Sequence, residues 1–347
     1  MLAVTPQSQQ LLVSVMLLSE VPFIPQLFLS YMSEAFATKS RLVNSGIMST
    51  NSAIQAEFLK GGSTIDLPFF SDLSGDSEVL DDTVGLTPAS LGGGVQRGVR
   101  QNKGRAWQGS DLAAELAGSD PIRHIASRVG VYWTRELQKS MIAILNGLFG
   151  ASGALEGTHT AGGTDVQLAA SVLLDGFAKL GDEGEGLSGI IMHSAVFYAL
   201  AKADLLVGPG FSTAQIDTRV SAERPEFPTF YGRQVLVDDT MTVDAGAGTG
   251  GGAGADVYNT YLFAPGAFSY AMCPAKTPTE IDRDSLKGIE YLINRNEFMV
   301  HPNGCNWAGT AAKQGGPNLT ELATPANWTK VFSDDKNIKI VEVQTYL

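Results

Sequence analysis

The sequence has little charge, and the charge it has is mostly acidic. Only 17% of its 347 residues are Asp, Glu, Lys or Arg, and the formal net charge is −12. Soluble domains usually carry about 25% charged residues, so we expect other molecules to cover part of this surface. The acidic balance argues against a general nucleic-acid-binding protein, which needs a basic face to displace counterions from phosphates. It leaves open a container that holds nucleic acid without gripping it.

Cysteine and long apolar runs are also scarce. The two cysteines, Cys273 and Cys305, lack CxxC spacing, which favours two ordinary thiols and leaves a bridge between them open. Residues 11–18 are apolar, but no Lys or Arg precedes them and the run is far too short to span a bilayer. The sequence therefore predicts a protein that is neither secreted nor embedded in a membrane.

Motifs for catalysis, cofactors and metals are missing or incomplete. Residues 246–251 satisfy GxGxxG, but a strand pattern follows them where a dinucleotide site needs a helix, so we predict a loop tip. The four histidines form no HExxH or other metal-binding pattern. His193 and Ser194 are neighbours, which does not supply the geometry of a nucleophile and its base. We predict no enzyme activity and no catalytic, cofactor-binding or metal-binding residue.

The most regular feature present is a helix over residues 119–150. Apolar residues recur every three or four positions from Ile122 to Leu148 and form one stripe. Pro121 suits the first turn, and the glycines at 147 and 150 are expected to end the helix. About thirty residues at helical rise give a rod of roughly 45 Å. We expect this spine helix to organise the fold.

Residues 61–108 predict a long two-armed β excursion whose arms carry opposite charge. Its first part has six acids and no base, and four bases then follow within nine residues. Either the arms neutralise each other, or they meet complementary charge on another subunit, or the stretch is a solvated loop. The subunit-contact hypothesis names Asp66, Asp72, Asp76, Glu78, Asp81, Asp82, Arg97, Arg100, Lys103 and Arg105. It also expects that reversing Arg97, Arg100 and Arg105 to Glu leaves the subunit folded and blocks assembly, because the excursion lacks core residues.

The rest of the chain predicts an arm, an α+β block and returning strands. Residues 1–60 indicate an arm with two short helices. In the block of about 155–285 we expect a helix over 164–180, a strand over 187–193, a helix capped by Ser194, a hairpin at Tyr231-Gly232 and a strand over 257–263. Strands at 288–293, 298–301 and 338–343 are expected to return to the spine helix.

This order resembles the major capsid protein of tailed bacteriophages, which has the HK97-type fold. Three stretches carry the resemblance: WQGSDLAAELAGSDPIRHIASRVGVYWTRELQKSMIAILNGLFG from Trp107, SGIIMHSAVFYALAKADLL from Ser188 and RNEFMVHPNGCNWAG from Arg295. The resemblance implies an α+β fold with an N-terminal arm at 1–60, an extended E-loop at 61–108, a peripheral domain from 109–150 and 286–347, and an axial domain at 151–285.

The resemblance also implies a function and partners. It implies a structural, late-expressed virion protein that self-assembles as hexamers and pentamers into an icosahedral shell around double-stranded phage DNA, in the host cytoplasm, without sequence-specific binding or a membrane. Portal and scaffolding proteins, and decoration proteins in some relatives, are the implied partners. Because no long scaffolding segment precedes the arm, we expect scaffolding to be a separate protein. Lys103 lies where some relatives cross-link, but no motif identifies an Asn partner, so no cross-link is predicted.

Two alternatives stay open at this point. One is an encapsulin-like nanocompartment shell protein, which shares the fold. The other is an α/β hydrolase or oxidoreductase that uses His193 and Ser194 or the glycine run.

Overall fold

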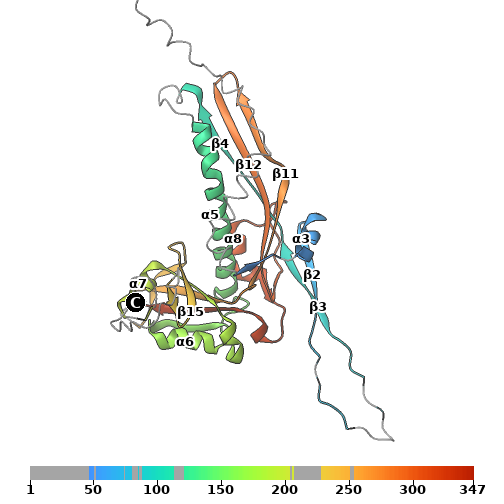
Figure 1. Ribbon diagram of the computed structural model, residues 1–347, viewed down its shortest axis with the longest axis vertical. Helices are drawn as coiled ribbons and strands as arrows, with labels where there is room; N and C mark the ends of the chain where they lie inside the picture. The colour runs from blue at the N-terminus through green and yellow to red at the C-terminus, as the bar shows by residue number, and fades with distance from the viewer. Residues whose placement is uncertain are drawn as a thin grey trace, which may run out of the picture.

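A long helix beside a long sheet forms the body of the molecule (Figure 1). A compact second sheet lies at one end of this body, and a hairpin projects away from the body at the same end. The computed structural model describes residues 47–50, 52–73, 75–79, 85, 88–112, 121–203, 205–206, 228–250 and 254–347. The two helices expected within residues 1–46, and the charges of Asp81 and Asp82, lie outside the described residues.

The predicted spine helix is confirmed as α5 (Pro121–Phe149). Its apolar stripe is buried, from Val129 and Trp133 to Leu145 and Leu148, because residues three and four apart share one helix face. Gly147 does not end the helix, as expected from the sequence, but lies inside it. A Cβ at this position would stand 2.7 Å from Trp328 Nε1 and would also meet the Leu322 carbonyl. Close packing against the chain's C-terminal part therefore explains this glycine.

A four-stranded sheet runs along α5 in the order β1 (Met48–Ser49), β11 (Phe268–Asp284), β12 (Ile289–Pro302) and β4 (Gln101–Ser110). The two strands expected at 288–293 and 298–301 are one continuous strand, β12. Its residues Leu292, Phe298 and Val300 share the core of the spine helix, and the Trp133 indole donates a 2.5 Å hydrogen bond to Asn294 Oδ1. β11, which the sequence placed in the α+β block, also belongs to this sheet.

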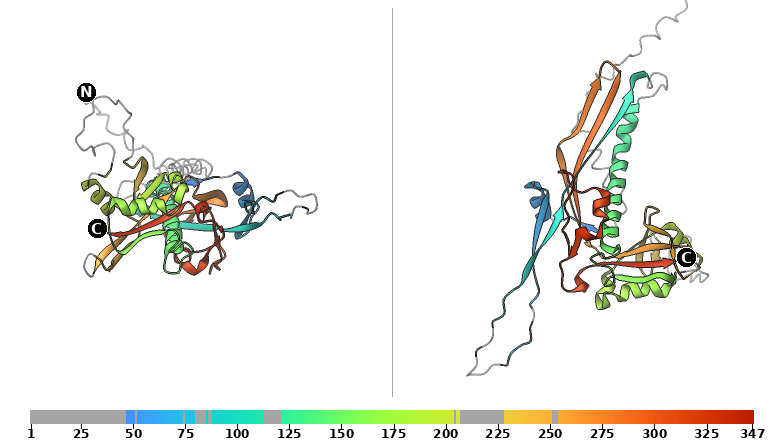
Figure 2. Two further views of the ribbon diagram at one scale, coloured as in Figure 1. Left: turned by 90° about the horizontal axis from the view of Figure 1, so that it is seen from below. Right: turned by 180° about the vertical axis from the view of Figure 1, so that it is seen from behind.

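The second sheet has seven strands and lies beside the C-terminal end of α5 (Figures 1 and 2). Six strands follow the order β5 (Thr160–Gln167), β15 (Ile340–Tyr346), β10 (Ala255–Phe263), β6 (Gly189–Met192), β8 (Arg233–Val237) and β7 (Thr229–Phe230), while β9 (Val243–Gly248) pairs with β10. The helices α6 (Ala170–Ala178) and α7 (Ser194–Lys202) cover one face with a core of their own. The predicted strands at 187–193 and 257–263 and the hairpin at Tyr231-Gly232 are confirmed.

Three expectations for this region were wrong in detail. Residues 164–167 form the end of β5 and only then does α6 begin, because pairing of β5 with β15 overrides the local helical pattern. His193, not Ser194, caps α7, since its Nδ1 accepts a hydrogen bond from the Ala195 amide. The strand expected to return to the spine helix, β15, pairs with β10 along its whole length and lies between β5 and β10 in this sheet. Only its first residue, Ile340, belongs to the core of the spine helix.

The remaining elements connect these parts. Helix α3 (Ser52–Leu59) packs on β11, and the antiparallel hairpin of β2 (Thr64–Phe70) and β3 (Gly93–Val99) follows it. The chain's C-terminal part adds β13 (Cys305–Trp307), α8 (Leu319–Leu322), η3 (Pro325–Asn327), β14 (Trp328–Lys330) and η4 (Asp335–Asn337), while η2 (Gly181–Gly186) follows α6. α8 and η3 contact α5, as expected for chain returning to the spine helix.

Candidate assembly surfaces

The two arms of the excursion neutralise each other at one position. Asp66 on β2 lies directly opposite Arg97 on β3, and Arg97 Nε donates to Asp66 Oδ1 at 2.8 Å. The hydrogen bond to Asp66 raises the pKa of Arg97. About half of each side chain is exposed, so this cross-strand pair fixes the register of the hairpin more than it stabilises it.

The other three bases lie beyond the hairpin. Arg100 sits at its root, where the guanidinium pairs with Glu297 at 2.9 Å, lies 4.3 Å from the Phe58 ring centre and donates to the Phe58 carbonyl. Lys103 on β4 donates to Ser140 Oγ at 2.8 Å, and burial lowers its pKa to about 8. Arg105, also on β4, is exposed. Arg100 and Lys103 therefore contribute to packing within the subunit.

The root of the hairpin contains core residues, contrary to the expectation from the sequence. Ile65 and Val99 are both buried, and Ile65 packs with Ile54, Phe58 and Met299. The reason for expecting a folded triple variant, that the excursion lacks core residues, therefore does not hold at Arg100. Its replacement by Glu would set a carboxylate against Glu297 in a site where both side chains are only 16% exposed.

The far end of the hairpin exposes both acidic and large apolar side chains. Asp72, Asp76 and Glu78 are exposed there, and Asp72 Oδ1 accepts the Leu73 amide. Three large apolar side chains in the same stretch are almost bare, with Phe70 80%, Leu73 83% and Val79 93% exposed. We call residues 70–73 and 75–79 the hairpin tip. Exposed apolar side chains grouped on a protrusion are typical of a contact surface.

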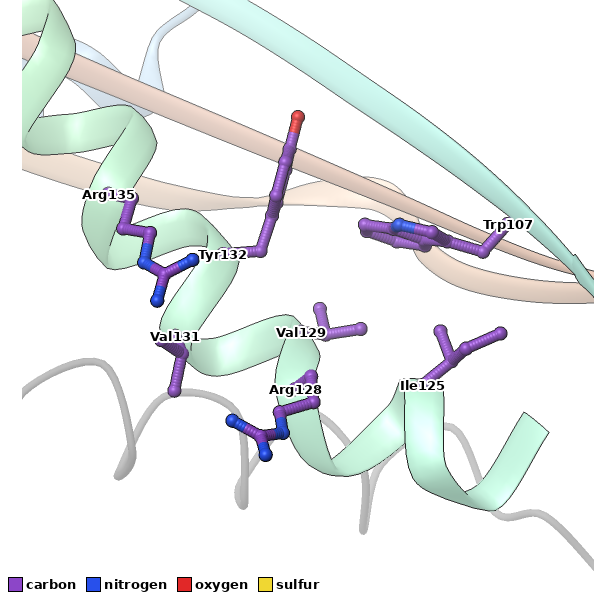
Figure 3. A pocket seen from close by; sticks show the side chains of 7 residues that line it. All are labelled: Trp107, Ile125, Arg128, Val129, Val131, Tyr132 and Arg135. Carbon is purple, nitrogen blue, oxygen red and sulfur yellow. The ribbon is translucent and has the colours of Figure 1, made fainter. Parts of the chain in front are cut away.

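A second surface lies where the N-terminal half of α5 faces β4. Trp107 and Tyr132 meet edge to face, with ring centres 5.2 Å apart. With Ile125, Val129 and Val131 they line a pocket of about 310 Å³, and Arg128 and Arg135 stand at its side (Figure 3). Both arginines are exposed and form no ion pair within the described residues. We call this the spine pocket.

The sequence pattern did not single out the spine pocket. Arg128 and Arg135 are seven residues apart and thus share one helix face, but they simply fell between the apolar positions of the stripe. In the sequence, Trp107 stands out only as the first residue of the stretch that leads into the spine helix and resembles the capsid family. Strand β4 brings Trp107 against Tyr132 through its pairing with β12, which links residues far apart in the chain.

The residues that the sequence offered as possible catalytic, nucleotide-binding or metal-binding groups have structural roles. His193 caps α7, and the Ser194 amide donates to Asp239 Oδ1 at 3.2 Å. Residues 246–248 end strand β9, which pairs with β10. Cys273 and Cys305 are free thiols. Among the described residues no group of His, Cys, Asp and Glu is arranged to hold a metal ion, and no helix there is long and apolar enough to cross a membrane.

Comparison with known proteins identifies the family. The Gp13-like model, described as major capsid protein 13-like, matches residues 118–339. The major capsid protein of Bacillus phage SPP1 is 37% identical over 322 residues, which cover 92% of this chain and 95% of that protein. The chain belongs to the Gp13-like family of major capsid proteins. It is therefore a structural capsid subunit of a bacteriophage and not an enzyme.

Solved capsid structures share the fold of this capsid protein at low sequence identity. The capsid of Ralstonia phage GP4 matches with a TM-score of 0.57 and 11% identity, covering 86% of this chain and 87% of that one. The cyanophage Pam1 capsid matches with a TM-score of 0.56 and 12% identity, covering 89% and 93%. These matches confirm the α+β, HK97-like capsid fold. Neither the encapsulin-like shell nor the hydrolase is supported.

Proposed function

We propose that copies of this capsid protein assemble, as hexamers and pentamers, into a closed icosahedral shell that encloses double-stranded DNA. The hairpin tip is the observation that supports this most directly. It exposes large apolar side chains on a thin two-stranded projection that reaches away from the body (Figure 1). An isolated two-stranded ribbon is at best marginally stable in water, so packing against neighbouring copies accounts for both its length and its composition.

The proposed division of labour follows the parts of the fold. α5 with the four-stranded sheet supports a peripheral domain from 109–150 and 286–347, and the seven-stranded sheet with α6 and α7 supports an axial domain at 151–285. Pairing modifies both proposed domains, because β11 joins the first sheet and β15 the second. Residues 1–60 would serve as the arm and 61–108 as the E-loop, whose projecting part is the hairpin.

The charged residues of the excursion enter this proposal in different ways. Exposed acids of the hairpin tip, Asp72, Asp76 and Glu78, are the proposed contacts with neighbouring copies, together with Arg105 on β4. Asp66 and Arg97 contribute through the register of the hairpin, and Arg100 and Lys103 by holding its root. Asp81 and Asp82 carry charge of the same sign in the same stretch of sequence and are included in the proposal on that ground.

The net charge supports a container rather than a binder of DNA. A chain with a net charge of −12 has no general attraction to phosphates, so packaged DNA would slide past it. Such a shell in the virion would form in the host cytoplasm and work with portal, scaffolding and decoration proteins.

The test is whether the chain assembles and whether the hairpin tip is needed. The full chain is expressed in bacteria, alone and with the scaffolding protein of its phage, and analysed by sedimentation and negative-stain electron microscopy. We expect closed particles for the wild type and unassembled subunits for the Phe70→Ser, Leu73→Ser, Val79→Ser triple variant. Circular dichroism melting should show that this variant is folded, because its three side chains contact solvent. Failure of the wild type to assemble in both settings would contradict the proposal.

A further inference from the structure

Two acidic side chains are buried in the described part of the chain, and only one of them has a basic partner. Glu290 on β12 is 7% exposed and pairs with Arg283 at 2.7 Å. Glu342 on β15 is 1% exposed, and no ion pair of the described residues includes it. We propose that Glu342 is a pH-sensitive switch in the seven-stranded sheet: with its proton bound the side chain holds β15 between β5 and β10, and its ionisation opens this junction.

Glu342 lies at the centre of the junction between three strands. Tyr261 on β10 is its direct partner on one side, and Thr160 on β5 is its direct partner on the other. Directly opposed residues of neighbouring strands share one face of a sheet, so the three side chains form a row. The Glu342 amide also donates to the His159 carbonyl at 2.9 Å. A change at this carboxyl group therefore acts on both neighbours of β15.

This row lies on the face of the sheet that meets the end of α5. The ring centres of Phe149, the last residue of α5, and Tyr261 are 5.7 Å apart, and both side chains belong to the core of the spine helix. Val341 and Val343, on either side of Glu342 in the chain, instead pack in the core beneath α6 and α7. The carboxyl group is thus enclosed by the body of the subunit.

The hydrogen bonds open to Glu342 suit a neutral carboxylic acid. One donor, Gln344 Nε2, reaches its Oε2 at 3.1 Å. The Tyr261 hydroxyl is close enough to act on the pKa of Glu342, but the Tyr261 hydroxyl and Asn259 Oδ1 both lack a hydrogen bond of good geometry. An ionised carboxylate only accepts hydrogen bonds, whereas a protonated one also donates. A proton on Glu342 therefore supplies a donor that these buried oxygen atoms need.

The charges around Glu342 also disfavour its ionised form. Burial, with the charges of Asp244 on β9 and Glu156 adding to it, raises the pKa of Glu342 to about 8. His159 is no counter-charge, because its Nε2 lies 3.0 Å from the Asp335 carbonyl oxygen and burial lowers its pKa. Ionisation would leave an unpaired charge in the interior, which is costly unless the group reaches water. Opening of the junction provides that water.

The pH range of the switch follows from linkage. In the open junction the carboxyl group meets water and regains its usual pKa of 4.5, whereas in the closed junction it keeps its proton up to about pH 8. Between these values closing takes up one proton, so the ratio of closed to open junction falls about tenfold for each pH unit. Below pH 4.5 and above pH 8 both states carry the same charge, and the ratio is constant.

Hydrogen exchange of the unassembled full chain, followed by mass spectrometry, tests the switch. Protection factors, corrected for the intrinsic exchange rate, are measured for peptides that cover β5 and β15. We expect protection of these peptides to fall about tenfold per pH unit from about pH 5 to about pH 8 and to level off above. Glu342→Gln is neutral at every pH, so its protection should stay constant over this range.

Glu290→Gln is the matched control, because it removes the other buried acid and leaves Glu342 in place. Its β5 and β15 peptides should show the pH dependence of the wild type. Infrared spectroscopy of the wild type reads the proton directly and needs no variant. The band of a protonated carboxyl group should be present at about pH 7, where an exposed Glu is ionised, and should disappear above about pH 9.

Three results would each overturn the inference. The first is the absence of a protonated carboxyl band from the wild type at neutral pH. The second is wild-type protection of β15 that does not change between about pH 5 and about pH 8. The third is the same pH dependence in Glu342→Gln as in the wild type. A metal cation held by an ionised Glu342 would give the first result, together with protection of β15 that falls when a chelator is added. The inference concerns the folded subunit, so it stands or falls independently of shell assembly.

Discussion

Reversing Arg97 and reversing Arg100 should have very different effects on the folded subunit, although the two residues are only three apart. Arg97 pairs with Asp66 on the hairpin, and about half of each side chain is exposed. Arg100 pairs with Glu297 where each side chain is 16% exposed, and its guanidinium also lies over the Phe58 ring and donates to the Phe58 carbonyl.

The expected magnitudes follow from this difference in burial. Solvent screens an exposed pair, which therefore contributes little to stability, so Arg97→Glu should lower the free energy of unfolding only slightly. Breaking a largely buried pair costs about 3–5 kcal/mol, because the remaining charge is left without compensation. Arg100→Glu should therefore cost several times more, since it also places two carboxylates together and removes the contact with Phe58.

Urea unfolding of the unassembled chain, followed by circular dichroism, measures both values. The double variant Arg100→Glu, Glu297→Arg restores opposite charges at the root of the hairpin and should recover part of the loss, whereas Glu297→Arg alone should not. If Arg100→Glu costs no more than Arg97→Glu, then the root of the hairpin does not stabilise the fold as described here.

Three further predictions concern buried positions. Burial raises the pKa of Glu342 from 4.5 to about 8, so the contribution of this side chain to stability is present below pH 4.5 and is lost as the pH rises through 8. Glu342→Gln should therefore stabilise the chain by about 3 kcal/mol at pH 7 and by little at pH 4. Urea unfolding at both pH values measures this difference. Burial lowers the pKa of His301 from 6.5 to about 4, so stability should fall by about 3 kcal/mol as the pH drops from 6.5 to 4, and melting of His301→Gln should lack that component. Gly147→Ala should destabilise the chain by about 1–3 kcal/mol because the new methyl group meets Trp328 and the Leu322 carbonyl; an equal melting temperature for variant and wild type would contradict the packing described for α8.

Local patterns predicted the elements well where one face of an element meets a single core. The stripe of α5 and the strands β6 and β10 are examples, and burial follows their spacing. The pattern failed at 164–167, which has helical spacing but pairs with β15. It also split β12 in two, because the charged residues in its middle, Arg295 and Glu297, form ion pairs with Glu280 and Arg100.

The candidate surfaces were predicted only in part. The acidic side of the hairpin was visible because its acids follow one another in sequence. The spine pocket was not, because it joins Trp107 to a helix face whose arginines have no motif around them. Nor did spacing show that Arg100 and Lys103 face inward, since that depends on how β4 pairs with β12.

By itself the sequence determined the spine helix, the strand-rich C-terminal part, the charge opposition of the excursion and the resemblance to tailed-phage capsid proteins. These depend on residues near one another in the chain, or on the order of segments. The tertiary structure decided which sheet β11 and β15 join. It also decided which basic side chains pack within the subunit, as Arg100 and Lys103 do, and which remain exposed, as Arg105 does. Each of those outcomes depends on partners that meet only after folding, as Arg100 and Glu297 do across 197 residues of chain.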